Sequence, residues 1–103
     1  MIKLSVFYPN GEGKNFDMEY YCNEHMPMVQ KKLGTLCKNV AVDQGMGGTE
    51  PGSPALYTAI GHIYFESMED LQTAFSLHTE PIMKDIPNFT DIEPIMQISE
   101  VKI

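Results

Sequence analysis

The sequence predicts an α+β fold in which two helices cover one face of a four-stranded antiparallel sheet. Four segments carry the alternating apolar pattern that is typical of strands, at residues 2–8, 37–43, 55–65 and 92–103. Two further segments carry apolar residues at spacings of three and four, which is typical of helices. The predicted order is strand, helix, strand, strand, helix, strand, which is the order of a ferredoxin-like fold.

The first strand and the first helix have clear local signals. Apolar side chains alternate along 2–8, and a turn sequence at 9–11 ends the strand. Asp17 is placed to cap the next helix, with Phe16 packing back on its first turn, and Gly34 is placed to end it. The apolar face of this helix is predicted to contain Met18, Cys22, His25, Val29 and Leu33, with Tyr21 beside them.

The second and third strands are joined by residues 44–54, which are rich in Gly and Pro. We expect this segment to be a long, mobile connection. The third strand has bulky side chains on both faces, so both faces should be covered. One face is predicted to carry Tyr57, Ala59, Gly61, Ile63 and Phe65, and the other Thr58, Ile60, His62 and Tyr64.

The second helix is predicted to begin at a capping box that starts with Ser67. We expect this helix to end near Leu77. A separate short helical turn should then begin around Pro81, because proline is favoured in the first turn of a helix. His78 would then lie at a helix C-terminus, where a cation suits the helix dipole.

Charge and composition restrict the class of protein. Asp and Glu outnumber Lys 14 to 7, and there is no Arg, so the net charge of −7 should repel phosphate backbones and anionic lipids. We therefore expect neither nucleic acid nor a membrane as a partner. The chain shows no signal peptide, no apolar run of roughly 20 residues and only two isolated cysteines. These features predict a single cytoplasmic domain over residues 1–103.

A sheet with both helices on one face leaves its other face open. In this chain the open face would carry large apolar side chains, and an apolar patch of that size usually marks an interface. We therefore expect two copies to form a homodimer through their sheets. The alternative is a monomer with a modestly hydrophobic open face.

His25 is the best candidate for a functional residue. It lies on an otherwise apolar helix face, so its imidazole must find a partner or lose about 1–3 kcal/mol. Pro27 cannot donate a hydrogen bond to the carbonyl of Asn23, so the helix should kink or restart near His25 and leave room beside the ring. This setting fits a general acid/base or a substrate-orienting donor. The alternative is a core histidine that bonds a freed carbonyl.

Other reactive side chains have two interpretations each. His62 and Tyr64 share one strand face, where they could frame a pocket or join the dimer interface; the interface is preferred unless that face carries the helices. Cys22 is one helical turn before His25 and could pair with it, although such a cysteine is usually a small core residue. The three histidines are too widely spaced for a metal motif, so neither a metal nor another cofactor is predicted.

Residues 16–29, FDMEYYCNEHMPMV, resemble the first-helix signature of the EthD family, which is named from ethyl tert-butyl ether degradation. That signature is an aspartate that opens a helix, an aromatic pair, and His-x-Pro followed by a hydrophobic pair. The resemblance extends to Tyr8-Pro9, to residues 64–67 and to the total length. It implies a dimeric α+β barrel of two ferredoxin-like protomers, and it makes His25 the leading site residue.

The resemblance also implies a range of functions, because the broader superfamily includes cofactor-free monooxygenases, isomerases, polyketide cyclases and haem-degrading proteins. The first hypothesis is a small enzyme that acts on a hydrophobic or aromatic molecule, with His25 as acid/base. The second is a non-catalytic protein that binds a small molecule in a catabolic pathway, and haem handling is a third. The expected substrate-binding residues are Tyr8, Tyr21, Cys22, His62 and Tyr64.

Overall fold

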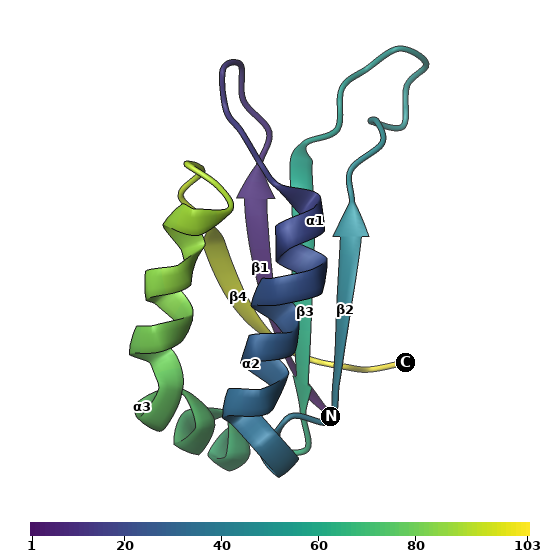
Figure 1. The fold of residues 1–103 in the computed structure, drawn as a ribbon. Coiled ribbons are helices and arrows are strands. Elements are labelled where there is room, and N and C mark those ends of the chain that lie inside the picture. The colour runs from purple at the N-terminus through teal and green to yellow at the C-terminus, as the bar shows by residue number, and fades with distance from the viewer.

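The computed structural model describes residues 1–103 and shows the predicted order of elements (Figure 1). The strands are β1 (Ile2–Pro9), β2 (Asn39–Gln44), β3 (Tyr57–Phe65) and β4 (Ile95–Glu100). The helical segments are α1 (Met18–Tyr20), a π-helical turn (Tyr21–His25), α2 (Met26–Leu33) and α3 (Met68–Asp85), with 3₁₀ turns at Gly34–Leu36 and Ile86–Asn88. All strand pairs are antiparallel, in the order β2-β3-β1-β4, which confirms the ferredoxin-like fold.

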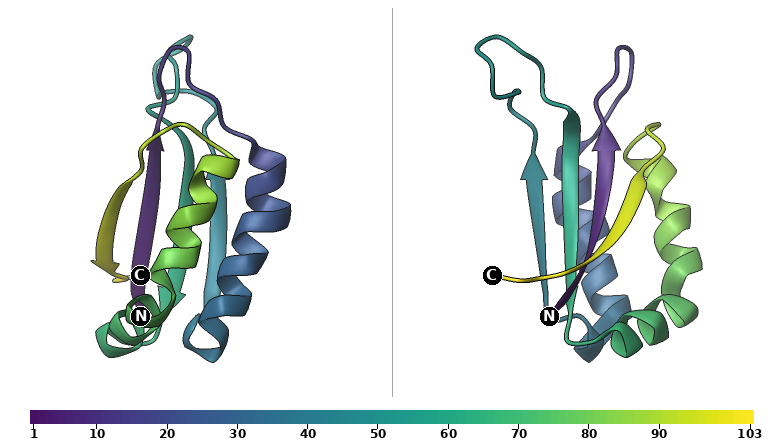
Figure 2. Two further views of the ribbon diagram at one scale, coloured as in Figure 1. Left: turned by 60° about the vertical axis from the view of Figure 1, so that its left-hand side comes forward. Right: turned by 180° about the vertical axis from the view of Figure 1, so that it is seen from behind.

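The sheet and the helices form two layers. Figure 2 shows the helices on one side of the sheet only. The core fills the space between the layers, and burial of its apolar surface is the main stabilising contribution. Its central members are Leu4, Val6 and Tyr8 from β1, Ala59, Ile63 and Phe65 from β3, Val29 and Leu33 from α2, and Leu71, Ala74 and Ile82 from α3.

The first helix changes its geometry where Pro27 removes a backbone donor. Asp17 caps α1, since its carboxylate accepts a hydrogen bond from the amide of Tyr20 at 3.0 Å. A π-helical turn follows, in which the amide of Met26 donates to the carbonyl of Tyr21. The break expected near His25 is confirmed. The wider turn shifts the helical phase, so Tyr21 is buried and Cys22 is exposed, and the prediction that Cys22 lies on the apolar face is wrong.

Helix α3 is one continuous helix where the sequence predicted two. Its cap is the predicted one, because Ser67 Oγ accepts from the amide of Asp70 at 3.1 Å. Pro81 lies inside the helix and does not begin a new one. Figure 1 shows that α3 bends, which is the expected effect of the missing backbone donor. His78 is therefore inside α3, and its predicted place at a helix C-terminus is wrong.

The open face of the sheet is polar in its middle. The strand register places Ala41, His62, Ser5 and Gln97 in one row across all four strands. The next row contains Ile60, Phe7 and Ile95, and it is apolar apart from Asp43 at its β2 end. The sequence-based expectation of an apolar open face therefore holds at one end of the sheet only.

Tyr57 extends this apolar end. The register of β1 and β3 shifts after the Tyr8–Ala59 pair, so that Tyr57 pairs with Pro9. The Tyr57 and Phe7 rings then lie 5.1 Å apart between their centroids. The prediction that Tyr57 shares a face with Ala59 and Gly61 is wrong, because simple alternation does not continue through an irregularity in the strand.

Candidate functional site

A cavity of about 410 Å³ lies between the helices and the sheet. Fourteen of its 18 lining residues are hydrophobic, and the lining comes from all the strands except β2, from α2 and α3, from the π-helical turn and from the 3₁₀ turn at Ile86–Asn88. Met96 and Ile98 line it from the edge strand β4 and are 44% and 49% exposed, so the cavity opens beside this strand. This volume and lining are typical of a site for a small apolar ligand.

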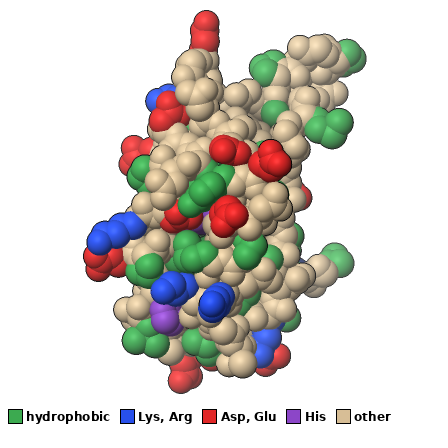
Figure 3. Space-filling view, viewed as in Figure 1, with side chains coloured by type: hydrophobic (Ala, Val, Ile, Leu, Met, Phe, Trp, Pro, Cys, Tyr) green, Lys and Arg blue, Asp and Glu red, His purple; other side chains and the backbone are tan.

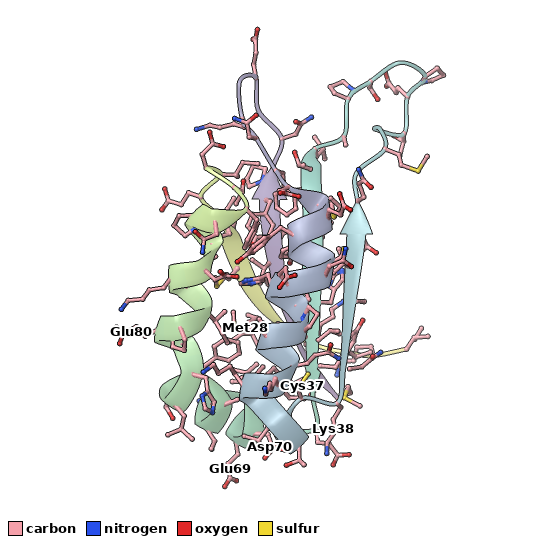
Figure 4. All side chains as sticks on the ribbon, in the orientation of Figure 1. Met28, Cys37, Lys38, Glu69, Asp70 and Glu80 are labelled. Atoms are coloured by element: carbon pink, nitrogen blue, oxygen red, sulfur yellow. The ribbon has the colours of Figure 1, made fainter.

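The surface on the helix side is mixed. Figure 3 shows apolar side chains between the charged side chains over the two helices. In Figure 4, Met28 lies on α2 toward α3, whereas Glu80 projects outward from α3. Glu80 pairs there with Lys84 at 3.1 Å, and both side chains are exposed. Charge therefore lies on the outside of the helix layer, while the cavity behind it is apolar.

His25 lies at this cavity and is held by Asp85. The residue is 4% exposed, and its Nδ1 is 2.9 Å from Asp85 Oδ2. Burial lowers the pKa of His25 below its ordinary value of 6.5, and the bond to Asp85 only partly opposes this effect. The imidazole is therefore neutral at neutral pH.

Asp85 is the centre of a small hydrogen-bond network at the end of α3. Its Oδ1 accepts hydrogen bonds from the Tyr20 hydroxyl at 2.7 Å and from Asn88 Nδ2 at 2.9 Å. Partial burial alone would raise the pKa of Asp85, but the bonds from Asn88, His25 and Tyr20 outweigh it and lower the pKa. Asp85 is therefore ionised and can only accept hydrogen bonds.

The state of the His25 ring follows from this network. Since Asp85 only accepts, Nδ1 of the neutral imidazole carries the proton and donates it. Nε2 then has a lone pair and bonds to no protein group. No buried side-chain nitrogen or oxygen lacks a partner, so Nε2 is accessible, and the accessible space beside His25 is the cavity. A neutral imidazole that a carboxylate holds in one tautomer can accept a proton at its other nitrogen.

Aromatic rings fix the position of His25. The Tyr21 ring stacks on the imidazole, with ring centroids 5.5 Å apart and an angle of 15° between the ring planes. The centroid of the Phe89 ring lies 4.7 Å from that of the imidazole. The chain around Phe89 is tied to the start of the first helix, because its carbonyl accepts from the amide of Asp17 at 2.7 Å. Two segments distant in the sequence therefore pack against the imidazole, and the Tyr21 and Phe89 rings also contact each other, with centroids 5.0 Å apart.

Tyr8 and Tyr21 bring hydroxyl groups to the same cavity. Each is only 1% exposed, and their rings meet edge to face at 5.6 Å. Burial raises the pKa of both phenols, so both stay protonated. The Tyr21 hydroxyl lies against Gly61 of β3, where a Cβ atom would be 2.0 Å from it. Gly61 thus provides the space in which this hydroxyl sits.

The structure brings together three of the predicted site residues and separates the other three. Tyr8, Tyr21 and His25 line the cavity. Cys22 is exposed on the outside of the first helix, where its sulfur lies 3.8 Å from that of Met18. His62 and Tyr64 are on the open face of the sheet, where the interface interpretation was preferred, and they do not reach the cavity.

His62 has its own partners on that open face. Its Nδ1 lies 3.0 Å from Ser5 Oγ, and its Nε2 lies 3.0 Å from Asp43 Oδ2. Both ring nitrogens are therefore occupied. No group of three or more His, Cys, Asp and Glu side chains is arranged to hold a metal ion. None of the helices has the length and apolar character that crossing a membrane requires.

Sequence reasoning missed Asp85, Phe89 and Gly61 as site residues. One signal for Asp85 was present: an acidic residue near the C-terminal end of a helix opposes the helix dipole and therefore needs compensating donors. That signal could be used only if α3 were known to continue past Pro81. Gly61 interrupts an otherwise bulky strand, which often marks the close approach of another group.

Comparison with known proteins identifies the family. The family model described as "EthD domain" matches residues 10–93. The chain belongs to the EthD family. An EthD-like protein from Ralstonia eutropha JMP134 has a similar structure, with a TM-score of 0.95 and 42% identity over 99% of this chain and 92% of that one.

Other solved structures share the fold at lower identity. An EthD family protein from Bacillus halodurans C-125 matches with a TM-score of 0.75 and 23% identity over 99% of both chains. A protein from Bacteroides fragilis NCTC 9343, described as dimeric and ferredoxin-like, matches with a TM-score of 0.52 and 12% identity over 97% of this chain and 95% of that one. None of the curated proteins matches this sequence.

Proposed function

We propose that this EthD family protein is an enzyme that binds a hydrophobic or aromatic small molecule in the cavity and removes a proton from it with His25. The observation that carries this proposal is a neutral imidazole, buried and held by Asp85, whose Nε2 has no protein partner and which lines an apolar cavity. A buried base with an oriented lone pair and a carboxylate behind it is the arrangement that general-base catalysis needs.

The surroundings of His25 support proton transfer. Apolar walls exclude water, which strengthens the electrostatic interactions inside the cavity. When Nε2 takes up a proton, the ring becomes an imidazolium, and the ionised Asp85 at 2.9 Å stabilises that charge. Asn88 and Tyr20 hold the carboxylate in place during this step.

The reaction class follows from the base. Proton removal from a carbon atom gives a carbanion, which is the first intermediate in isomerisation and in ring closure and which can also react with oxygen. No group in this set transfers electrons, so we assign the protein's own contribution as proton transfer and positioning. A cofactor-free isomerase, cyclase or oxygenase reaction fits this contribution.

We also propose that the protein forms a homodimer through the open face of its sheet. Phe7, Tyr57, Ile60 and Ile95 make one end of that face apolar, and Ile95 is 56% exposed. The related fold from Bacteroides fragilis is described as dimeric. Light scattering during size-exclusion chromatography should give twice the mass of the chain, and the chain mass alone would contradict the proposal.

Deuterium exchange tests the proton-transfer proposal directly. The bicyclic aromatic ketone 2-tetralone is an apolar probe with acidic C–H groups, and the protein should accelerate their exchange in D₂O, measured by NMR. His25→Gln should still bind 2-tetralone but lose the acceleration. As the pH is lowered, the exchange rate should stay constant to below pH 6.5, the ordinary pKa of histidine, and should fall only then. The reason is that burial lowers the pKa of His25.

Two results would count against this function. Exchange by His25→Gln at the wild-type rate would exclude His25 as the base. Binding of 2-tetralone without any exchange by the wild-type protein would favour the non-catalytic binding hypothesis for this ligand class. Cys22→Ser is the matched control on the outer side of the same helix, and it should leave both binding and exchange unchanged.

A further inference from the structure

We infer that the Tyr21 hydroxyl, supported by Tyr8, donates a hydrogen bond to an oxygen of the ligand that becomes negatively charged, so that the site selects ring-containing carbonyl compounds. This inference rests on the proposed function and adds a second group to it. His25 would take the proton, and Tyr21 would stabilise the charge that the proton leaves behind.

One short helical segment places the two groups together. Tyr21 and His25 come from the same π-helical turn, their rings are stacked at 5.5 Å, and both line the same cavity. A ligand that contacts Nε2 of His25 therefore lies beside the Tyr21 ring. A π-helical turn is a frequent feature of functional sites, because it changes which side chains share a face.

The Tyr21 hydroxyl has a defined position against the sheet. It lies over Gly61 in the middle of β3, at a place where any other residue would put its Cβ atom 2.0 Å away. Glycine lowers the stability of a strand at such a position, because it has no side chain to pack. Here it allows a hydroxyl to sit on the floor of the cavity, on the rigid central part of the sheet.

The proton of this hydroxyl is available to a ligand. Neither phenol donates to the backbone or to a charged group of the protein. The Tyr8 and Tyr21 rings meet edge to face at 5.6 Å, and the two phenols are close enough for each to affect the pKa of the other. Tyr8 thus packs beside Tyr21 as a polar neighbour, and the Tyr21 hydroxyl proton can be given to a ligand.

The chemistry balances without any further reactant. The ligand C–H bond next to a carbonyl breaks, its proton goes to Nε2 of His25, and its electron pair forms the C=C bond of an enolate. The negative charge then lies on the carbonyl oxygen, where the Tyr21 hydroxyl donates to it. A donor at this place stabilises the charged state more than the ground state, which is the condition for lowering the barrier.

The substrate class follows from these groups. It has a carbonyl oxygen and an acidic C–H group on adjacent carbons, since one donor and one base from the same helical turn must reach both. The rest of the molecule is apolar and is small enough for about 410 Å³. An aromatic or alicyclic ketone meets these conditions, whereas a plain hydrocarbon or ether lacks the oxygen acceptor next to an acidic carbon.

A pair of matched ligands tests Tyr21 without any need for turnover. 4-Nitrophenolate imitates an enolate, and 4-nitrotoluene has nearly the same shape without the charged oxygen. Tyr21→Phe should weaken the binding of 4-nitrophenolate by about tenfold or more, which corresponds to one hydrogen bond to a charged group. It should leave the binding of 4-nitrotoluene unchanged. Tyr8→Phe should reduce the same preference by a smaller factor.

Two further variants complete the experiment. Tyr57→Phe, a tyrosine on the open face, is the control and should bind both ligands as the wild type does. Gly61→Ala keeps the Tyr21 hydroxyl but displaces it, and it should also lower the preference for 4-nitrophenolate. Melting temperatures show which variants remain folded.

The inference is overturned if Tyr21→Phe weakens the binding of both ligands equally or weakens the binding of neither. It is also overturned if the wild type binds neither ligand. Failure of the proposed function gives a different result, namely no 2-tetralone exchange by a wild-type protein that still prefers 4-nitrophenolate through Tyr21.

Discussion

The two faces of the sheet each hold a histidine bonded to an aspartate, yet their surroundings differ. On the helix side, His25 uses one ring nitrogen for Asp85 and keeps the other at an apolar cavity. On the open side, His62 uses both ring nitrogens, one for Ser5 and one for Asp43. The comparison shows that a carboxylate partner does not by itself indicate a base. We infer a base only at His25, where the second ring nitrogen is free and the residue lines an apolar cavity.

The two aspartates differ in the same sense. The Asp85 side chain is 18% exposed and serves three donors, whereas the Asp43 side chain is 65% exposed and serves one. Water screens and replaces the bonds of an exposed carboxylate, so the pair on the open side should contribute little to stability. The pair on the helix side should contribute much more, because its donors cannot all turn to water.

The largest expected effect is therefore the loss of Asp85. Asp85→Ala leaves the buried His25 Nδ1 without its acceptor and should lower the free energy of unfolding by about 2–4 kcal/mol. Asp43→Ala, its counterpart on the open face, should cost less than about 1 kcal/mol. Urea unfolding of both variants measures the difference. Equal losses would mean that the two histidine–aspartate pairs are equivalent after all.

Gly61→Ala should have the next largest effect. The added methyl group would meet the Tyr21 hydroxyl at 2.0 Å, and overpacking of this kind costs about 1–3 kcal/mol. Tyr21→Phe removes the clashing oxygen and leaves a ring carbon 3.3 Å from the new methyl group. The double variant should thus be more stable than Gly61→Ala alone.

A double-mutant cycle in urea measures this coupling. Additive effects of Gly61→Ala and Tyr21→Phe would show that the Tyr21 hydroxyl does not depend on the space at Gly61. Gly47→Ala is a control in the loop between β2 and β3, where the nearest atom is a backbone oxygen 3.2 Å from the added Cβ, and it should have a smaller effect.

The fold could be predicted largely from local signals. Strand alternation, the caps at Asp17 and Ser67 and the break at Pro27 each depend on residues that are close in the sequence. The prediction that a new helical turn begins at Pro81 was wrong, because it used only the local preference of proline for the first turn of a helix. Ile82 and Ile86 beyond it are buried against the core, and this tertiary packing continues α3 through the proline.

The site could be predicted only where its residues share one element or one strand face. Tyr21 and His25 lie four residues apart, and Tyr8 is on the regular part of β1. Asp85 is 60 residues from His25, and no sequence period relates them. The same holds for Phe89, which reaches the imidazole only because its loop pairs with the start of the first helix. Such contacts need the tertiary structure.

The smallest expected effect is on the pH dependence of stability. Burial lowers the pKa of His25 in the folded protein below 6.5, so at lower pH the unfolded chain binds the proton more readily than the native one. The contribution of His25 to the free energy of unfolding is therefore complete above about pH 7.5 and is lost as the pH falls toward the pKa of His25 in the folded protein. The free energy of unfolding should change by at most about 1.4 kcal/mol per pH unit from this source.

His25→Gln should remove this contribution, so the free energy of unfolding of the variant should change less than that of the wild type between about pH 7.5 and pH 5. His62→Gln, from the other face, should keep it, because His25 and Asp85 are unchanged. All three proteins are compared by urea unfolding at one protein concentration, since association would also depend on concentration. If His25→Gln and wild type show the same pH dependence, burial does not lower the pKa of His25 in the folded protein, and the argument for a neutral imidazole that rests on burial fails.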